Sequence, residues 1–124
     1  MKLTDLAIGD LIFINNTPHK IQAIDSIDAE ILADDELYYV GEDRCHSEDK
    51  IEGIPLTPEI LEKNGWWYDG YGIWQHKEVS FCIEKCNGRF QCYDINDIKL
   101  DSVHQLQQTL RLCGLNELAD NFKV

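Results

Sequence analysis

The sequence predicts an α+β fold, in which a small N-terminal antiparallel β-barrel-like unit of SH3 size precedes a helix, an antiparallel β-meander or hairpin and a C-terminal helix. Two observations predict it. Short β-rich runs alternate with turn residues through about the first 50 residues, as in small barrels and meanders. Helix start and stop signals then appear twice, on either side of an Asn-Gly hairpin signal. The chain has 124 residues, enough for one domain of ordinary size.

The first strands of the N-terminal unit are expected on either side of a turn. Residues 11–14 are β-rich and follow Gly9, which permits a turn with positive φ. Residues 15–18 form a turn cluster. Residues 19–24 then alternate polar and apolar side chains, as a half-buried strand does.

Two more short strands are expected at 30–32 and 37–40. Residues 41–53 are polar and predict a solvated connector, so we place a boundary at its end. On this basis residues 1–53 form a β-rich acidic subdomain and residues 54–124 an α+β subdomain, and we expect the two to share one core.

The second half opens with a short helix. Thr57 is placed to act as its N-cap, and Pro58 suits the first helical position because its missing N–H would be unpaired there in any case. Gly65 is a stop signal just past the end. We therefore predict a two-turn helix over 58–64.

The C-terminal helix begins after Ser102, because Ser102 and Gln105 have the spacing of a capping box. One face carries apolar side chains at helical spacing, namely Val103, Leu106, Leu110 and Cys113. Gly114 ends this helix, and Asn116 is placed to cap a short final turn at 117–121. His104 lies in the first turn, where contact with the cap is a simpler role than catalysis.

Strands are expected at 72–76, 79–85 and 89–95, with Asn87-Gly88 as a type I′ turn between the last two. A two-residue turn makes Cys86 face Arg89 and sets the alternation of the two faces. The apolar face carries Phe81, Ile83, Phe90 and Cys92, and the other face carries Cys82, Glu84, Cys86, Arg89, Gln91 and Tyr93. Because Cys92 points away from the other two thiols and the sequence has no C-x-x-C spacing, we predict structural cysteines, no metal site and no cofactor.

The sequence is strongly acidic. Lys and Arg number 11 and Asp and Glu 23, which gives a net charge of −12. Residues 25–52 hold eleven acidic side chains against two basic ones, a local charge of −9. This charge repels nucleic acids and anionic membranes and favours a basic protein as partner. The alternative is a solvated surface that maintains solubility.

The composition also bears on the compartment. The longest apolar runs have four or five residues, far short of the roughly 20 needed to span a bilayer. The first residues lack the apolar region of a signal peptide. We therefore expect a cytoplasmic protein whose five cysteines are reduced.

Five aromatic residues lie within nine positions: Trp66, Trp67, Tyr68, Tyr71 and Trp74. About half of them are expected to pack in the core between helix and sheet. Neighbouring residues of an extended strand point to opposite faces, so at least one of Trp66 and Trp67 should be exposed. Exposed Trp and Tyr side chains beside a Gly-rich loop are typical anchors of protein interfaces.

Three segments form a spaced pattern: residues 6–11 (Leu-Ala-Ile-Gly-Asp-Leu), 54–66 (Ile-Pro-Leu-Thr-Pro-Glu-Ile-Leu-Glu-Lys-Asn-Gly-Trp) and 103–107 (Val-His-Gln-Leu-Gln). This pattern resembles small cytoplasmic proteins of Bacteroidetes genomes, prophages and mobile elements, although the tail from Gln108 departs from the aromatic stretch common there. The resemblance implies a mobile-element setting and a β unit followed by an α+β unit. It supplies no catalytic residues.

These observations together predict a non-enzymatic phage or mobile-element protein that binds and inhibits a basic nucleic-acid-handling host protein in the host cytoplasm, such as a CRISPR effector nuclease. No catalytic motif is present. The expected partner-binding residues are Asp28, Glu30, Asp34, Asp35, Glu36, Glu42, Asp43, Trp67, Tyr68, Tyr71 and Trp74. Two alternatives stay open: a small ligand-binding protein or enzyme with its site near residues 66–74, and a self-associating accessory protein.

Overall fold

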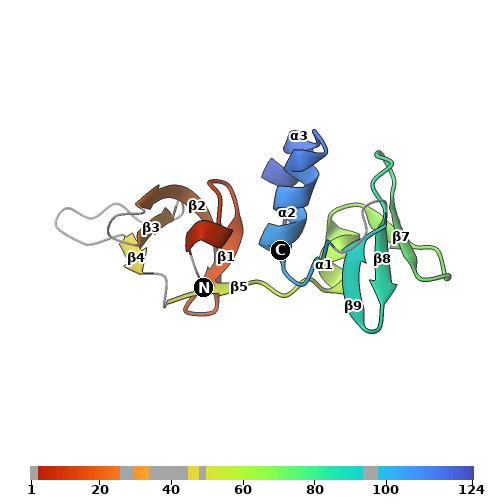
Figure 1. Cartoon of the computed structure of the whole chain (residues 1–124), viewed down its shortest axis with the longest axis horizontal. Helices are drawn as coiled ribbons and strands as arrows, with labels where there is room; N and C mark the ends of the chain where they lie inside the picture. Colours follow the sequence, from red (N-terminus) through yellow and green to blue (C-terminus); the bar gives the residue numbers. More distant parts are fainter. Residues whose placement is uncertain (1–2, 26–29, 34–44, 48–49, 94–97) are drawn as a thin grey trace.

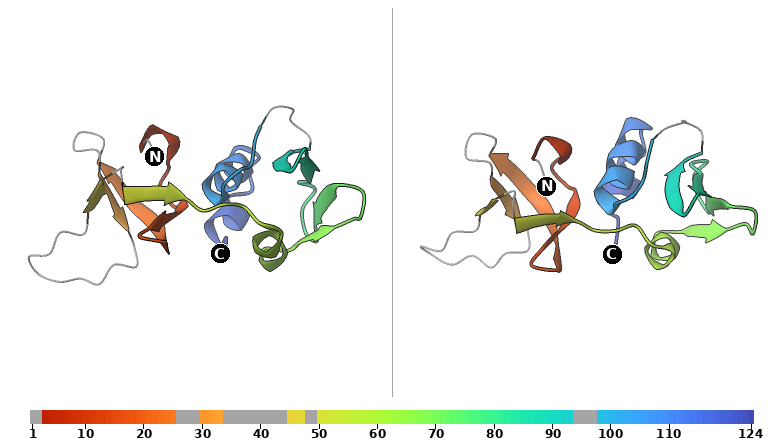
Figure 2. Two further views of the ribbon diagram at one scale, coloured as in Figure 1. Left: turned by 90° about the horizontal axis from the view of Figure 1, so that it is seen from below. Right: turned by 60° about the horizontal axis from the view of Figure 1, so that its bottom comes forward.

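The structure is a computed structural model, and it describes residues 3–25, 30–33, 45–47, 50–93 and 98–124. Helices and antiparallel sheets are both present, so the predicted α+β class is confirmed. Figure 1 shows one sheet at each end of an elongated molecule, with α2 and α3 between them. The two views of Figure 2 show the same order.

The first sheet has the strand order β4-β3-β2-β1-β5, and the neighbouring strands are antiparallel. A short 3₁₀ helix precedes it. The elements are η1 (Leu3–Asp5), β1 (Leu11–Ile14), β2 (Thr17–Asp25), β3 (Glu30–Ala33), β4 (Cys45–Ser47) and β5 (Ile51–Gly53). Because β4 and β5 form opposite edges and do not pair in the described part, the expected barrel-like closure was wrong; the sheet is open.

The turn between β1 and β2 is tighter than the sequence predicted. Asn15 and Asn16 both have positive φ, 51° and 63°, which makes a two-residue turn suited to a hairpin. Strand β2 therefore begins at Thr17 and includes Pro18. Pro18 lies beyond the part of β2 that pairs with β3, so its missing N–H leaves the described pairing intact.

The predicted connector at 41–53 was wrong where the structure describes it. Strand β4 pairs with β3, and β5 pairs with β1 so that Ile51 lies opposite Ile14 in the core. Three-residue strands are too short to show an alternating pattern, and this is why the sequence did not reveal them. The expected strand at 37–40 lies outside the described residues.

The second half contains a four-stranded antiparallel sheet in the order β6-β7-β8-β9. Its elements are α1 (Pro58–Lys63), β6 (Trp66–Tyr68), β7 (Ile73–His76), β8 (Ile83–Cys86), β9 (Arg89–Cys92), α2 (Val103–Leu112) and α3 (Asn116–Asp120). Cys86 lies opposite Arg89 across a turn at Asn87 and Gly88, both with positive φ, so the predicted hairpin register is confirmed. Strand β6 was not predicted, and β8 begins four residues later than the strand expected from 79.

Both helix starts follow the predicted capping. Thr57 accepts a hydrogen bond from the N–H of Ile60 (3.3 Å), and Gln105 accepts one from the N–H of Ser102 (3.1 Å). Helix α2 ends at Leu112, and Gly114 follows with φ 78°. The sequence had suggested that Cys113 belongs to the buried face of this helix. That prediction was wrong, because Cys113 is the C-cap and is exposed.

The buried apolar side chains form two clusters. The smaller one fills the first sheet: Leu6, Ile12, Ile14, Ile21, Ile31 and Ile51. The larger one lies between the second sheet and the helices, and its fully buried members on α2 are Val103, Leu106 and Leu110. Leu11, from the other face of β1, belongs to this larger cluster, so β1 contributes to both.

A buried carboxylate joins the first sheet to α2. Asp10, which is fully buried, accepts hydrogen bonds from Arg111 (2.6 Å), Gln108 (2.7 Å) and the N–H of Ala7 (2.8 Å). Arg111 also approaches Asp120 at 3.7 Å. Burying a carboxylate is unfavourable unless such donors replace its water, so Asp10 fixes the position of α2 relative to β1.

Gln107 completes this junction. Its side-chain oxygen accepts the N–H of Leu11 (2.8 Å), and its side-chain nitrogen donates to the carbonyls of Gly9 (3.1 Å) and Ala119 (3.0 Å). Gln107 is fully buried, and its amide therefore satisfies backbone groups of β1 and α3 that would otherwise lose a partner. We call Asp10, Gln107, Gln108 and Arg111 the Asp10 junction.

The three spaced segments of the sequence meet along α2. The N–H of Val103 donates to the carbonyl of Ile54 (2.8 Å), and the N–H of Leu56 donates to the carbonyl of Asp101 (3.1 Å). The first segment contacts the same helix farther along, where the side chain of Gln107 bonds to the N–H of Leu11 and the carbonyl of Gly9. Their joint presence in the sequence therefore has a structural reason: the first two segments both contact the helix that the third begins.

We predict that Asp10→Asn lowers the free energy of unfolding by about 3 kcal/mol, because it leaves the guanidinium of Arg111 in the junction without its closest carboxylate. Urea unfolding measures this. The exposed ion pair of Arg89 and Asp101 supplies the control, since Asp101→Asn makes the same chemical change in solvent and should leave the midpoint nearly unchanged. Equal losses of unfolding free energy in the two variants would contradict the stabilising role of the buried Asp10 carboxylate.

Candidate functional site

The aromatic segment divides between core and surface. Trp66 and Trp74 are buried, with exposed fractions of 2% and 5%, and Trp66 donates its indole N–H to the carbonyl of Phe81 (3.2 Å). The expectation that Trp74 is a partner-binding residue was wrong, because its ring faces the core from β7. Trp74 instead supports Tyr68, whose ring centroid lies 5.4 Å from its own.

Three aromatic side chains of the segment are exposed. Trp67 and Tyr68 each expose 49% of their surface, and Tyr71 exposes 90%. Trp67 and Tyr68 are neighbours on β6 and so point to opposite faces of the sheet. The segment therefore offers an edge of the sheet with aromatic rings on both sides, and not one flat patch.

The turn that carries Tyr71 is held by several hydrogen bonds. One carboxylate oxygen of Asp69 accepts the N–H groups of Tyr71 (2.7 Å) and Ile73 (3.3 Å), as in an Asx turn. The hydroxyl of Tyr68 accepts the N–H of Gly72 (3.0 Å), and the Gly72 carbonyl accepts the N–H of Lys85 (3.0 Å). A nearly fully exposed ring is thus presented on an ordered backbone, which lowers the entropy that binding would cost.

The outer face of the second sheet continues from Trp67. The register of the sheet places Gln75 opposite Trp67, and Tyr93, with its N–H on the carbonyl of Cys82, lies across the same face. Tyr93 exposes 52% of its surface. Alternation along the hairpin predicted Tyr93 on this polar face, but Tyr93 was not among the predicted binding residues. That predicted place on the outer face was the signal available in the sequence.

Most of the predicted acidic binding residues lie outside the described part of the chain, namely Asp28, Asp34, Asp35, Glu36, Glu42 and Asp43. Glu30 begins β3, where its backbone lies opposite Asp25 and Ser47. The acidic surface therefore stays a prediction from the sequence.

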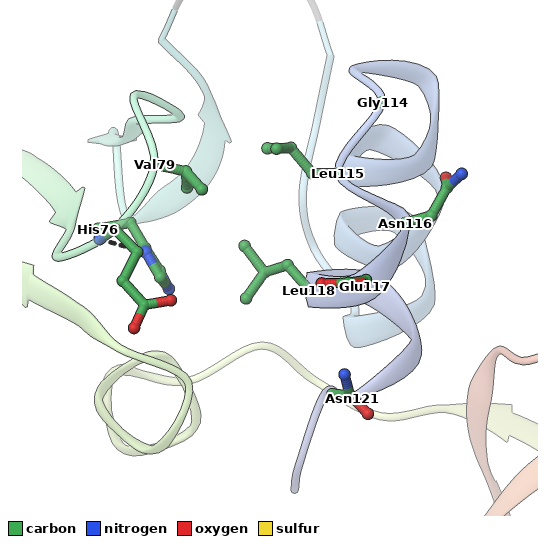
Figure 3. Close-up of a pocket in the computed structure, with 9 residues that line it drawn as sticks. His76, Val79, Gly114, Leu115, Asn116, Glu117, Leu118 and Asn121 are labelled. Carbon is green, nitrogen blue, oxygen red and sulfur yellow. Dashed lines mark hydrogen bonds between the residues drawn. The ribbon is translucent and has the colours of Figure 1, made fainter.

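A cleft of about 610 Å³ lies between the β7–β8 loop and the segment that includes α3. Val79, Leu115 and Leu118 supply its apolar walls and point into the space between them, as Figure 3 shows. Glu78 and Glu117 are the charged residues that line it. The sequence did not reveal this cleft, because its two sides are about 40 residues apart and no local pattern joins them.

His76 forms one side of the cleft and is held by two backbone groups. Its Nε2 lies 2.8 Å from the carbonyl of Asn64, and its Nδ1 accepts the N–H of Glu78 (3.0 Å; Figure 3). The carbonyl requires a donor and the N–H an acceptor, so these two bonds assign the ring proton to Nε2 and the acceptor role to Nδ1. The two backbone groups therefore fix the ring of His76 in the cleft wall.

His104 is the other buried histidine among the described side chains, and it lies in the first turn of α2. Its Nδ1 lies 3.0 Å from the hydroxyl of Ser102, so the predicted contact with the helix cap is confirmed. Burial lowers the pKa of His104 below its ordinary value of 6.5, and the negative charges of Asp10 and Asp5 oppose this shift. A neutral histidine that contacts a cap is a structural residue.

We predict that Gly65→Ala lowers the free energy of unfolding by more than about 1 kcal/mol. Gly65 has φ 93°, and a Cβ there would lie 2.8 Å from Nε2 of His76, which must then leave the Asn64 carbonyl. Gly88→Ala is the matched control, because its φ is 79° and a Cβ would meet no described atom within 4 Å. Thermal unfolding of the two variants separates the clash from the backbone strain. A smaller loss of stability for Gly65→Ala than for Gly88→Ala would contradict the predicted clash with His76.

We also predict that His104 makes stability depend on pH. The pKa of His104 is lower in the folded chain than in the unfolded one, so its contribution is complete above about pH 6.5 and is lost as the pH falls towards the lowered pKa. Urea unfolding of the wild type and of His104→Gln at about pH 7.5 and 5.5 measures this. The variant should lose less stability over this interval, and an unchanged dependence on pH would count against the assignment.

The remaining findings concern metal binding, membrane spans and similarity to known proteins. Among the residues that the structure describes, no three His, Cys, Asp or Glu side chains are grouped to hold a metal ion. In the same part of the chain, no helix has the length and apolar character that crossing a bilayer requires. Comparison of the chain with family models, with curated proteins and with solved structures found no match.

Proposed function

We propose that this chain is a non-enzymatic binding protein whose partner is a basic protein. The observation that carries the proposal is the ordered turn at residues 68–73, which presents Tyr71 with 90% of its surface exposed beside two half-exposed rings. Large exposed aromatic side chains on a rigid backbone are typical of binding hot spots, because they bury much area at little entropic cost.

The net charge supports a basic partner. At −12 for 124 residues, the field of the chain attracts cationic surfaces and speeds encounter with them. The same field disfavours direct binding to DNA or RNA phosphates. Within the class of basic proteins, the resemblance to mobile-element proteins favours a nucleic-acid-handling host protein that the chain would inhibit, such as a CRISPR effector nuclease.

A catalytic role has less support from the described residues. Both buried histidines there contact backbone or cap groups, and the cysteines of the β8–β9 hairpin lie on opposite faces of the sheet. Catalysis needs a nucleophile and a base held within reach of each other. These histidines bond to backbone or cap groups, and the two cysteines lie on opposite faces of the sheet. This distribution supports a binding protein over an enzyme.

The experiment that tests the proposal is affinity capture from extract of cells of the natural host, with and without nuclease treatment. The proposal expects a basic protein that is retained after nuclease treatment and whose association slows as salt rises. Capture that depends on nucleic acid, or a partner without a basic surface, would contradict it. A concentration-dependent mass of the isolated chain would favour the alternative of self-association.

We predict that Tyr71→Ala weakens binding to the purified partner about 30-fold, the loss expected for a hot-spot residue. Leu112→Ala is the matched control: Leu112 is also a large exposed apolar side chain (84%), but it lies on the last turn of α2. Calorimetric titration of both variants measures the difference. Equal affinity of Tyr71→Ala and the wild type would remove the turn from the interface.

A further inference from the structure

The cleft beside His76 combines two kinds of surface. Its apolar walls come from Val79 on the β7–β8 loop and from Leu115 and Leu118 around the start of α3. Polar side chains surround them, namely Glu78, Asn116, Glu117 and Asn121. This composition suits a ligand that is apolar along its length and polar at its end.

The charge of the cleft has a single sign. Glu78 and Glu117 are its charged lining residues, one from each side, and both are exposed. Among the residues that the structure describes, no lysine or arginine lines it.

The walls of the cleft are ordered before any ligand arrives. On one side, His76 is fixed by the carbonyl of Asn64 and the N–H of Glu78. On the other, α2 ends in a Schellman motif in which the N–H of Leu115 donates to the carbonyl of Leu110 (2.8 Å). The site is therefore largely formed in advance, as small binding sites usually are.

We propose that this cleft binds a lysine or arginine side chain of the basic partner. The apolar walls accommodate the methylene stem, and the carboxylates of Glu78 and Glu117 bind the cationic head. The amide oxygen of Asn121 is an acceptor for a remaining N–H group. The inference rests on the proposed function in one respect, since it assigns the cation to a basic partner protein.

The test uses short peptides and the full chain, and it needs no knowledge of the partner. Acetyl-Gly-Arg-Gly-amide and acetyl-Gly-Lys-Gly-amide are titrated against the labelled chain by NMR, with norleucine and glutamate peptides of the same length as probes of stem and charge. We expect saturable shifts of the methyl groups of Val79, Leu115 and Leu118 and of the side-chain amide of Asn121. The norleucine peptide should bind about fivefold more weakly, the difference that an exposed ion pair makes.

Charge variants sharpen the test. Glu78→Gln and Glu117→Gln should each weaken binding of the arginine peptide by up to about fivefold, and Glu52→Gln on β5 is the matched control for the same loss of charge elsewhere. Amide spectra of each variant confirm that it folds. Glu52→Gln should bind as the wild type does.

Two results would overturn the inference: equal binding of arginine and norleucine peptides, or shifts that map to Trp67 and Tyr71 in place of the cleft. If the peptides fail while the whole partner still binds, the proposed function stands and the cleft lies outside the interface. If the peptides saturate the cleft while no basic protein is captured, the site stands and the proposed function fails.

Discussion

The buried carboxylate of Asp10 is the interaction on which the placement of the two sheets depends. Its donors come from Ala7, three positions earlier in the chain, and from Gln108 and Arg111 on α2. Because a carboxylate without donors is costly in the interior, the turn before β1 and the middle of α2 hold each other in one geometry. Leu106 and Leu110 of α2 belong to the same core cluster as buried side chains of the second sheet, so the position set by Asp10 bears on both ends of the molecule.

Local chemistry in the sequence predicted the local structure. The capping residues Thr57 and Ser102 and the Asn87-Gly88 turn act within four residues of themselves, and each lies where it was predicted. Long-range pairing was not predictable in this way. Strands β4 and β5 have three residues each and no alternation of their own; they are strands only because β3 and β1 offer partners. The Asp10–Arg111 pair spans 101 positions, and no local pattern in a single sequence joins them.

The candidate site was likewise predictable only where local pattern determines it. Alternation along β6 correctly implied that one of Trp66 and Trp67 is exposed. Trp74 was assigned to the surface because residues 66–74 were treated as one cluster, whereas the register of β6 and β7 directs Trp74 inward beside Tyr68. The cleft was missed because it forms only when α3 meets the β7–β8 loop. The features that favour a basic partner thus come from two levels: charge from composition, and shape from the tertiary fold.

Hydrogen exchange at the amide of Leu11 tests the junction most directly. That N–H belongs to β1, but its acceptor is the side chain of Gln107 on α2, 96 positions away. If the junction holds the sheet and the helix together, the Leu11 amide exchanges as slowly as the amides in the centre of α2, because both then open in one cooperative step. Exchange of Leu11 that is about a hundredfold faster than that of α2, with the neighbouring amides of β1 still protected, would show that the two parts are not held by this contact.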